Sequence, residues 1–227
     1  MMALPELWKH LKFVSDYKDL SPSQKQFLEP VLYEELQARE VKRIRYLMQR
    51  SGIKRIKRID DFDWKFNPKI PRQKIMPFFQ SSEWSTHAEN IVFIGPAGVG
   101  QSHLADALCY QMITQKGIPT TRITCFDLVE KLKKSRNKYD LLNYYATVKI
   151  LCLDELGYVF PDQDQANDLF QIISKRSELL PTIVTTNLIP SQWGKVFEAA
   201  VATAILDRLS FKGSFIKCEG RSYRSKK

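Results

Sequence analysis

The sequence predicts an α/β fold in which a parallel sheet lies between helices, preceded by a small helical domain. Short apolar runs alternate with amphipathic segments from residue 91 to residue 218, a pattern typical of parallel strands covered by helices on both faces. A glycine-rich loop follows the first of these runs, and two acids follow a later one. Before the alternation, apolar residues recur at roughly helical spacing through residues 28–48, among many basic ones.

The N-terminal part of the chain, residues 1–62, is expected to form a basic helical domain. Ser21-Pro22-Ser23 is typical of a helix start. Pro30 lies inside the run and is expected to mark a kink or the start of a second helix. The helical pattern is interrupted near Ser51-Gly52. The sequence therefore predicts one or two amphipathic helices with a basic face.

The positive charge of the chain is concentrated in this N-terminal part. The net charge is +10, and nine basic residues but only one acid lie between Arg39 and Arg58. A charge run is usually only a solvated face, but most charges here have one sign, which favours double-stranded DNA as a partner through its phosphates. The residues expected to contact DNA are Arg39, Lys42, Arg43, Arg45, Lys54, Arg55, Lys57 and Arg58.

A connector with little regular structure is expected between Asp60 and Pro77. This segment starts with several acids and contains three prolines, which disfavour helices and strands. The domain boundary is placed here, so the second domain is expected to span residues 63–227. A short helix around residues 77–84 is expected to lead into the first strand.

The first strand and the loop after it carry the strongest motif of the chain. Ile91-Val92-Phe93-Ile94 is an apolar run, and a helix is expected from His103 to Gly117. The loop between them matches the phosphate-binding P-loop pattern G-x-x-x-x-G-K-[ST], except that Gln101 stands in place of lysine. For the loop alone, a plain turn is the alternative. The residues expected to bind a nucleotide are Gly95, Pro96, Ala97, Gly98, Val99, Gly100, Gln101, Ser102 and His103.

Alternating strands and helices follow the loop. Their apolar residues lie in short continuous runs or at helical spacing. Strands are expected at residues 118–124, 150–153, 182–186 and 214–218, and helices at residues 126–134, 164–178 and 199–209.

The ends of these elements place polar side chains where a nucleotide site requires them. Ser102 and Asp154 are expected to hold Mg²⁺, with Asp154 acting through water, and Glu155 is expected to orient or deprotonate the attacking water. Asn187 could reach the γ-phosphate, although it could equally be an ordinary turn former. Arg208 could complete the site of a neighbouring copy, or could simply pair with an acid such as Asp207.

The residue Gln101 removes one positive charge from this site. A glutamine can donate hydrogen bonds to phosphates, but it cannot neutralise the charge that develops during phosphoryl transfer. Because phosphoryl transfer depends on positioning and electrostatics, ATP hydrolysis is expected to suffer more than ATP binding.

The composition argues against other classes of protein. No apolar run approaches the ~18 residues of a membrane span, and residues 1–13 lack the continuous apolar core of a signal peptide. The four cysteines are widely spaced, so buried reduced thiols of a cytoplasmic protein are expected rather than disulfides or a metal site.

Taken in order, these motifs resemble those of the IstB family, the AAA+ helper ATPases of two-gene insertion sequences. The similarity covers most of the chain, and its most specific segments are Asp-Glu-Leu-Gly-Tyr at residues 154–158 and Gly-Arg-Ser-Tyr-Arg at residues 220–224. Other matching segments are 89–91, 98–100, 103–105, 170–176, 186–188, 193–197 and 204–209.

The resemblance implies a transposition helper that assembles on DNA in the presence of ATP, deforms the duplex, and recruits or stimulates a partner transposase. It also implies the AAA+ strand order, in which the strand ending before Asn187 lies between the P-loop strand and the strand ending at Asp154. Asn187 then matches sensor 1. Arg208 matches the arginine finger, which requires a head-to-tail oligomer, and Arg224 is a further nucleotide or subunit contact.

Two other functions stay open from the sequence. A replicative helicase loader related to DnaC would share the same ATPase core, although residues 154–158 and 193–197 favour the transposition helper. A nucleotide-independent DNA-binding protein with a vestigial P-loop would explain Gln101 without ATP hydrolysis. The site residues alone leave open whether ATP is hydrolysed.

Overall fold

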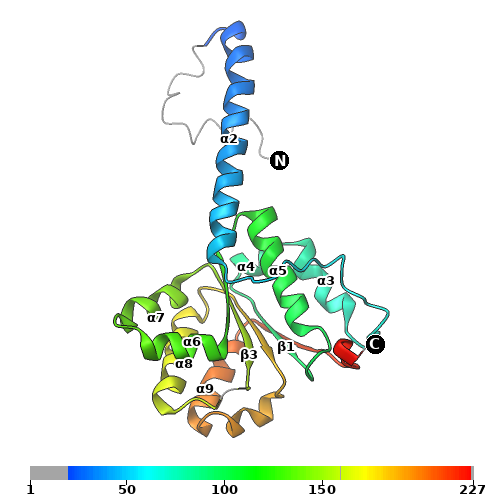
Figure 1. Cartoon of the computed structure of the whole chain (residues 1–227), viewed down its shortest axis with the longest axis vertical. Helices are drawn as coiled ribbons and strands as arrows, with labels where there is room; N and C mark the ends of the chain where they lie inside the picture. The colour runs from blue at the N-terminus through cyan, green and yellow to red at the C-terminus, as the bar shows by residue number, and fades with distance from the viewer. Residues whose placement is uncertain (1–19, 159, 226–227) are drawn as a thin grey trace. The chain divides into compact units, whose positions relative to one another are not determined.

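The computed structural model describes residues 20–158 and 160–225. The chain divides into two compact units, residues 1–43 and residues 44–227. The sequence placed the domain boundary at residues 62–63, whereas residues 44–62 belong to the second unit. All strands of the described residues lie in the second unit, and Figure 1 labels the elements along the chain.

The first described helix, α2 (Pro22–Arg50), starts in the first unit and ends in the second. Its start is a capping box, because the Ser21 hydroxyl accepts from the Gln24 amide and the Gln24 side chain accepts from the Ser21 amide. Pro30 lies inside the helix, so it marks no second start. The helix ends just before Ser51-Gly52, where the sequence predicted an interruption, and no residue of it is buried.

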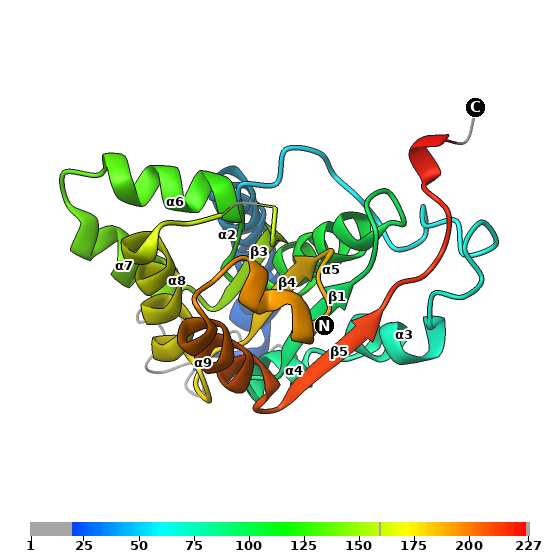
Figure 2. The ribbon, with the colours of Figure 1, turned by 90° about the horizontal axis from the view of Figure 1, so that it is seen from below.

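The sheet is built from five parallel strands in the order β2-β3-β4-β1-β5. The strand β4 lies between β1 and β3, as the resemblance implied, and Figure 2 shows the sheet from below. Because all strands run in one direction, their carboxyl ends meet at one edge. The strands are β1 (Asn90–Ile94), β2 (Thr120–Thr124), β3 (Ile150–Leu156), β4 (Thr182–Thr186) and β5 (Gly213–Lys217).

Helices cover both faces of this sheet. On one face lie α3 (Arg72–Gln80), α4 (Glu83–Thr86) and α5 (Gln101–Lys116). On the other face lie α6 (Cys125–Lys134), α7 (Lys138–Thr147), α8 (Gln163–Arg176) and α9 (Ala199–Ser210). Two short 3₁₀ helices complete the described elements, η2 (Pro190–Lys195) and η3 (Tyr223–Ser225).

Two of these elements differ from the sequence prediction. The single helix expected around residues 77–84 is the pair α3 and α4, separated where Ser81 adopts an extended conformation. The helix α7 was not predicted, because it buries only three side chains and so shows a weak apolar pattern. Asn137 caps its start by accepting a hydrogen bond from the Asp140 amide.

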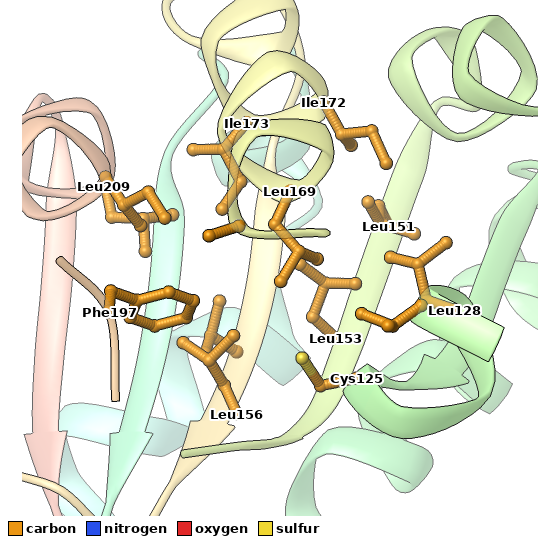
Figure 3. Packing of buried hydrophobic residues seen from close by; sticks show 14 of the residues in the cluster. Cys125, Leu128, Leu151, Leu153, Leu156, Leu169, Ile172, Ile173, Phe197 and Leu209 are labelled. Atoms are coloured by element: carbon orange, nitrogen blue, oxygen red, sulfur yellow. The ribbon is translucent and has the colours of Figure 1, made fainter. Parts of the chain in front are cut away.

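The apolar strands supply side chains to two separate cores, one on each face. In β3, Leu151 and Leu153 belong to the core under α6 and α8, whereas Ile150 and Cys152 belong to the core under α5, as expected for the two-residue period of a strand. Figure 3 shows Leu151 and Leu153 packed near Leu128 and Leu169. The apolar strand runs of the sequence reflect burial on both faces.

The composition argued against disulfides, a metal site and a membrane span, and the structure gives the state of the cysteines and the character of the helices. Cys109, Cys125, Cys152 and Cys218 are all buried and free. Within residues 20–158 and 160–225, no helix has both the length and the apolar character of a membrane span.

Candidate functional site

A cavity of about 560 Å³ lies at the carboxyl ends of the central strands, entirely within the second unit. This edge of an open parallel sheet is where such folds bind ligands. Its floor is the glycine-rich loop, from Ala97 to His103, with Glu155, Thr185 and Thr186 from β3 and β4. The remaining walls come from the segment after α2, the connector, the turn after β3 and the last residues described, through Ile56, Lys57, Asp61, Phe62, Asp63, Phe66, Asn67, Tyr158, Tyr223 and Arg224.

The backbone of the loop takes conformations that suit glycine. Gly98 and Gly100 have positive φ values of 84° and 114°, a region that L side chains rarely adopt. A Cβ atom on Gly98 would lie 2.1 Å from the Ser222 hydroxyl. The helix α5 begins directly after Gly100, so its free N–H groups and the positive end of its dipole point at this loop. Such a loop is suited to hold a phosphate group.

The side chain of Gln101 is buried beneath the loop. Its Nε2 atom donates to the Thr186 carbonyl at 2.9 Å and to the Phe93 carbonyl at 3.3 Å. Both amide hydrogens are therefore used by the main chain of β4 and β1. The side chain ties the first turn of α5 to the sheet, and it brings no charge to the cavity that it lines.

The two predicted metal ligands, Ser102 and Asp154, meet in the structure. The Ser102 hydroxyl donates to Asp154 Oδ1 at 2.9 Å, although the two residues are 52 positions apart. The hydroxyl of Thr185 donates to the same carboxylate oxygen. Hydroxyl and carboxylate oxygens are the ligands that Mg²⁺ prefers, so this donor set fits the metal.

Arg122 of β2 contacts the same carboxylate and was missed by the sequence predictions. Its Nη2 donates to Asp154 Oδ2, and its Nε donates to Asp106 Oδ1 at 3.1 Å. Burial alone lowers the pKa of Arg122, but the charges of Asp154 and Asp106 outweigh it and raise that pKa. The available signal was a charged residue in the middle of a predicted strand, where apolar and β-branched residues are usual.

Asp106, on α5, is the second partner of Arg122. Burial raises the pKa of its carboxyl to about 6, and the nearby charge of Asp154 acts in the same direction, against the Arg122 charge. Its side chain is mostly covered, with 16% exposed. Two carboxylates and one guanidinium therefore form a largely buried network behind the loop.

Glu155 points out of the sheet at an irregularity of β3. The pairing of β3 with β4 shifts between Leu153 and Leu156, and Glu155 has a positive φ of 61°. Its amide donates to the Thr185 hydroxyl at 3.0 Å, and its exposed side chain lines the cavity. Strained backbone of this kind often occurs at functional sites, and here it directs the carboxylate toward the cavity.

Unlike Glu155, Asn187 and Arg208 do not line the cavity. Asn187 directly follows β4 and packs near Gly157, but it is not among the cavity residues. Arg208, on α9, pairs with Asp207 and lines a separate hollow with Ser174 and Phe211. Within one copy of the described chain, Arg208 is therefore remote from the cavity.

Residues 221–223 and Asn67 form hydrogen bonds that connect the glycine-rich loop to the C-terminal segment. The amide of Tyr223 donates to the Gly98 carbonyl at 2.8 Å. The buried Asn67 side chain donates to the carbonyls of Val99 and Arg221, and accepts from the Arg221 amide. These contacts place Tyr223 and Arg224 at the cavity. The sequence showed the Gly-Arg-Ser-Tyr-Arg segment but not its contact with the loop.

The predicted DNA-binding residues fall into two groups. Arg39, Lys42 and Arg43 belong to the first unit, where Arg39 pairs with Glu35 and Arg43 with Glu40. The other five belong to the second unit. Seven of the eight side chains are exposed, and the half-buried Lys57 lines the cavity instead.

Comparisons with known proteins agree with this geometry. A family model described as IstB-like ATP binding protein matches residues 3–227. The chain is 36% identical over 196 residues to the ATP-binding protein of insertion sequence IS232 from Bacillus thuringiensis subsp. berliner, covering 85% of the chain and 78% of that protein.

Solved structures show the same fold. The crystal structure of DnaI has a TM-score of 0.61 and 21% identity, covering 73% of this chain and 89% of that one. The DnaC helicase loader has a TM-score of 0.55 and 23% identity, covering 65% and 87%. At this level of identity the likeness concerns the fold alone, which is the AAA+ form of the P-loop fold.

Proposed function

Because the chain belongs to the family of IstB-like ATP-binding proteins, we propose that it is an ATP-binding helper of insertion-sequence transposition. In this role it assembles on double-stranded DNA and recruits or stimulates a partner transposase. The observation that carries the proposal is the meeting of Ser102 with Asp154 at 2.9 Å, beside a glycine-rich loop that opens a helix. Such a pair is the oxygen donor set that a magnesium–nucleotide complex requires.

The loop and the cavity support ATP as the ligand. The main-chain N–H groups between Gly98 and Ser102 can surround phosphate oxygens, aided by the dipole of α5. Ser102 and Asp154 would hold Mg²⁺, with Asp154 acting through water. When bound, the metal neutralises phosphate charge and polarises the terminal phosphate. Binding therefore does not depend on a lysine at position 101.

The residues for hydrolysis come from more than one copy of the chain. Glu155 lines the cavity and can orient a water molecule, and Asn187 follows the neighbouring strand end. Arg208 is half-buried and does not line the cavity of its own copy. As an arginine finger it would reach a second copy, which requires a head-to-tail oligomer. Hydrolysis is expected to be slow, because Gln101 adds no positive charge.

The likeness to the helicase loader concerns the fold alone and does not favour helicase loading. The matching family model is that of IstB-like ATP-binding proteins, and the relative from Bacillus thuringiensis is an ATP-binding protein of an insertion sequence. The proposed partners are therefore DNA and a transposase.

Reversing four basic charges is expected to weaken DNA binding and flatten its salt dependence. The variant carries glutamate at Arg43, Arg45, Lys54 and Arg55, which are exposed. The logarithm of the DNA association constant falls linearly with the logarithm of the salt concentration. If all four residues contact phosphates, this negative slope should become shallower by about 3 to 4. Fluorescence anisotropy with a labelled duplex, with Mg-ATP present and over a series of salt concentrations, measures this slope.

A matched control carries glutamate at the exposed residues Lys65, Lys69, Lys74 and Lys116. It has the same net charge as the test variant but should keep most of the wild-type slope. Equal slopes in the two variants would show that DNA binds to another surface, or that DNA binding depends only on the net charge of the protein.

A further inference from the structure

Arg122 approaches the Asp154 carboxylate from behind the cavity. The guanidinium donates to Asp154 Oδ2, whereas Ser102 and Thr185 donate to Asp154 Oδ1. Ser102 and Thr185 line the cavity, but Arg122 does not. One oxygen of the buried carboxylate therefore accepts from two hydroxyls that line the cavity, and the other is held by a fixed cation.

The position of Arg122 is fixed by its main chain as well as by its side chain. Its amide donates to the Ser51 carbonyl at 2.6 Å. Gly52 has a φ of 74°, and a Cβ atom on it would lie 2.2 Å from the Arg122 carbonyl. The segment that follows α2 therefore packs closely on this residue of β2. The side chain is also largely covered, with 15% exposed.

We propose that Arg122 is a built-in cation of the metal site, which partly offsets the negative charge of Asp154 so that Mg²⁺ binds together with nucleotide phosphates rather than alone. This inference rests on the proposed nucleotide site. The network of Arg122, Asp106 and Asp154 has one net negative charge, with two carboxylates sharing one guanidinium. This charge is smaller than that of two unpaired carboxylates, so it attracts a divalent cation less strongly, and the phosphates supply further negative charge. Arg122 is thus a positioning residue that acts through Asp154.

Substitutions in this network are expected to shift the magnesium requirement in opposite directions. Arg122→Gln removes the cation, so the Mg²⁺ concentration for half-maximal binding of a fluorescent ATP analogue should fall about ten-fold. Asp106→Asn removes one carboxylate, so that concentration should rise by a similar factor. The double variant has the wild-type net charge and should lie close to wild type. All proteins are first treated with EDTA and then titrated with MgCl₂ at pH 8.

A second readout uses MgCl₂ without any nucleotide. Arg122→Gln leaves two buried carboxylates without their cation, so its melting temperature should rise with MgCl₂ more than that of wild type. The melting temperature of Asp106→Asn should respond less. Arg122→Lys keeps the charge and should behave like wild type in both assays.

The inference would be overturned if both single variants shifted the magnesium requirement in the same direction, or if neither shifted it. A purely structural role of Arg122 gives one of those results. If Arg122→Gln does not fold, Asp106→Asn alone decides, since an unchanged or lower magnesium requirement contradicts the inference. A wild-type protein that never binds the analogue contradicts the proposed function instead, and the melting experiment with MgCl₂ alone still tests Arg122.

Discussion

Replacing Gln101 by lysine is expected to raise the rate of ATP hydrolysis by roughly two orders of magnitude. Three other residues expected to act in hydrolysis lie at or next to the cavity, since Ser102 meets Asp154 and Glu155 lines the cavity. The missing part is a positive charge near the terminal phosphates. An ammonium group is strongly hydrated, so it should leave the carbonyls that hold the Gln101 amide and turn to the phosphates. Release of inorganic phosphate in the presence of DNA measures the rate.

Two control variants are needed. One separates the effect of the lysine charge from that of side-chain length, and the other excludes hydrolysis by a contaminating ATPase. Gln101→Met has a side chain of similar length without charge, so its hydrolysis rate should stay at the wild-type level. The double variant Gln101→Lys/Glu155→Gln should lose the gain, because it lacks the residue expected to orient water. If Gln101→Lys stays at background while its folding and nucleotide binding are normal, then Glu155, Asn187 or Arg208 is misassigned.

Replacing Arg176 by alanine is expected to lower the free energy of unfolding by about 3–5 kcal/mol. The side chain has 0% exposure and forms no ion pair within residues 20–158 and 160–225. Burial lowers the pKa of Arg176 to about 9, so the group is still protonated at neutral pH. Its hydrogen-bond acceptors are the carbonyls of Tyr145, Ala146, Val148, Lys149 and Pro181, and the Thr182 hydroxyl.

The acceptors of Arg176 explain why its loss should be costly. The last carbonyls of α7 have no partner within the helix, and the guanidinium satisfies two of them before β3 begins. Without it, several buried carbonyls lose their donor at once. Urea unfolding followed by circular dichroism measures the change. Lys175→Ala, next to it but exposed, should change stability by less than about 1 kcal/mol, and a similarly small change in Arg176→Ala would contradict this role.

The parallel sheet and its covering helices could be predicted because they rest on local patterns. Apolar runs such as Ile150–Leu153 are buried on both faces, so every residue of the run is apolar. The meeting of Ser102 and Asp154 could also be predicted, since Ser102 opens the helix after β1, Asp154 lies near the end of β3, and parallel strands end at one edge. The strand order came only from the resemblance, because apolar runs do not specify which strands are neighbours.

Other contacts between distant segments could not be predicted from the sequence. The Arg122 side chain meets Asp154 because β2 and β3 are adjacent, with Thr124 opposite Asp154 in the register. Asn67 bonds both to Val99 of the loop and to Arg221, which is 154 positions away. The buried position of the Gln101 amide depends on the carbonyls of two different strands. Each of these contacts exists only once the whole unit is folded.

We propose that the loop, the helix start and the metal ligands hold Mg-ATP although no lysine is present at position 101. Isothermal titration calorimetry of the full chain with ATP tests it directly, first with MgCl₂ and then with EDTA. We expect saturable heat of binding with MgCl₂ and much weaker binding with EDTA or in Ser102→Ala. Absence of any binding heat with Mg-ATP, on protein shown to be folded by circular dichroism, would contradict the claim.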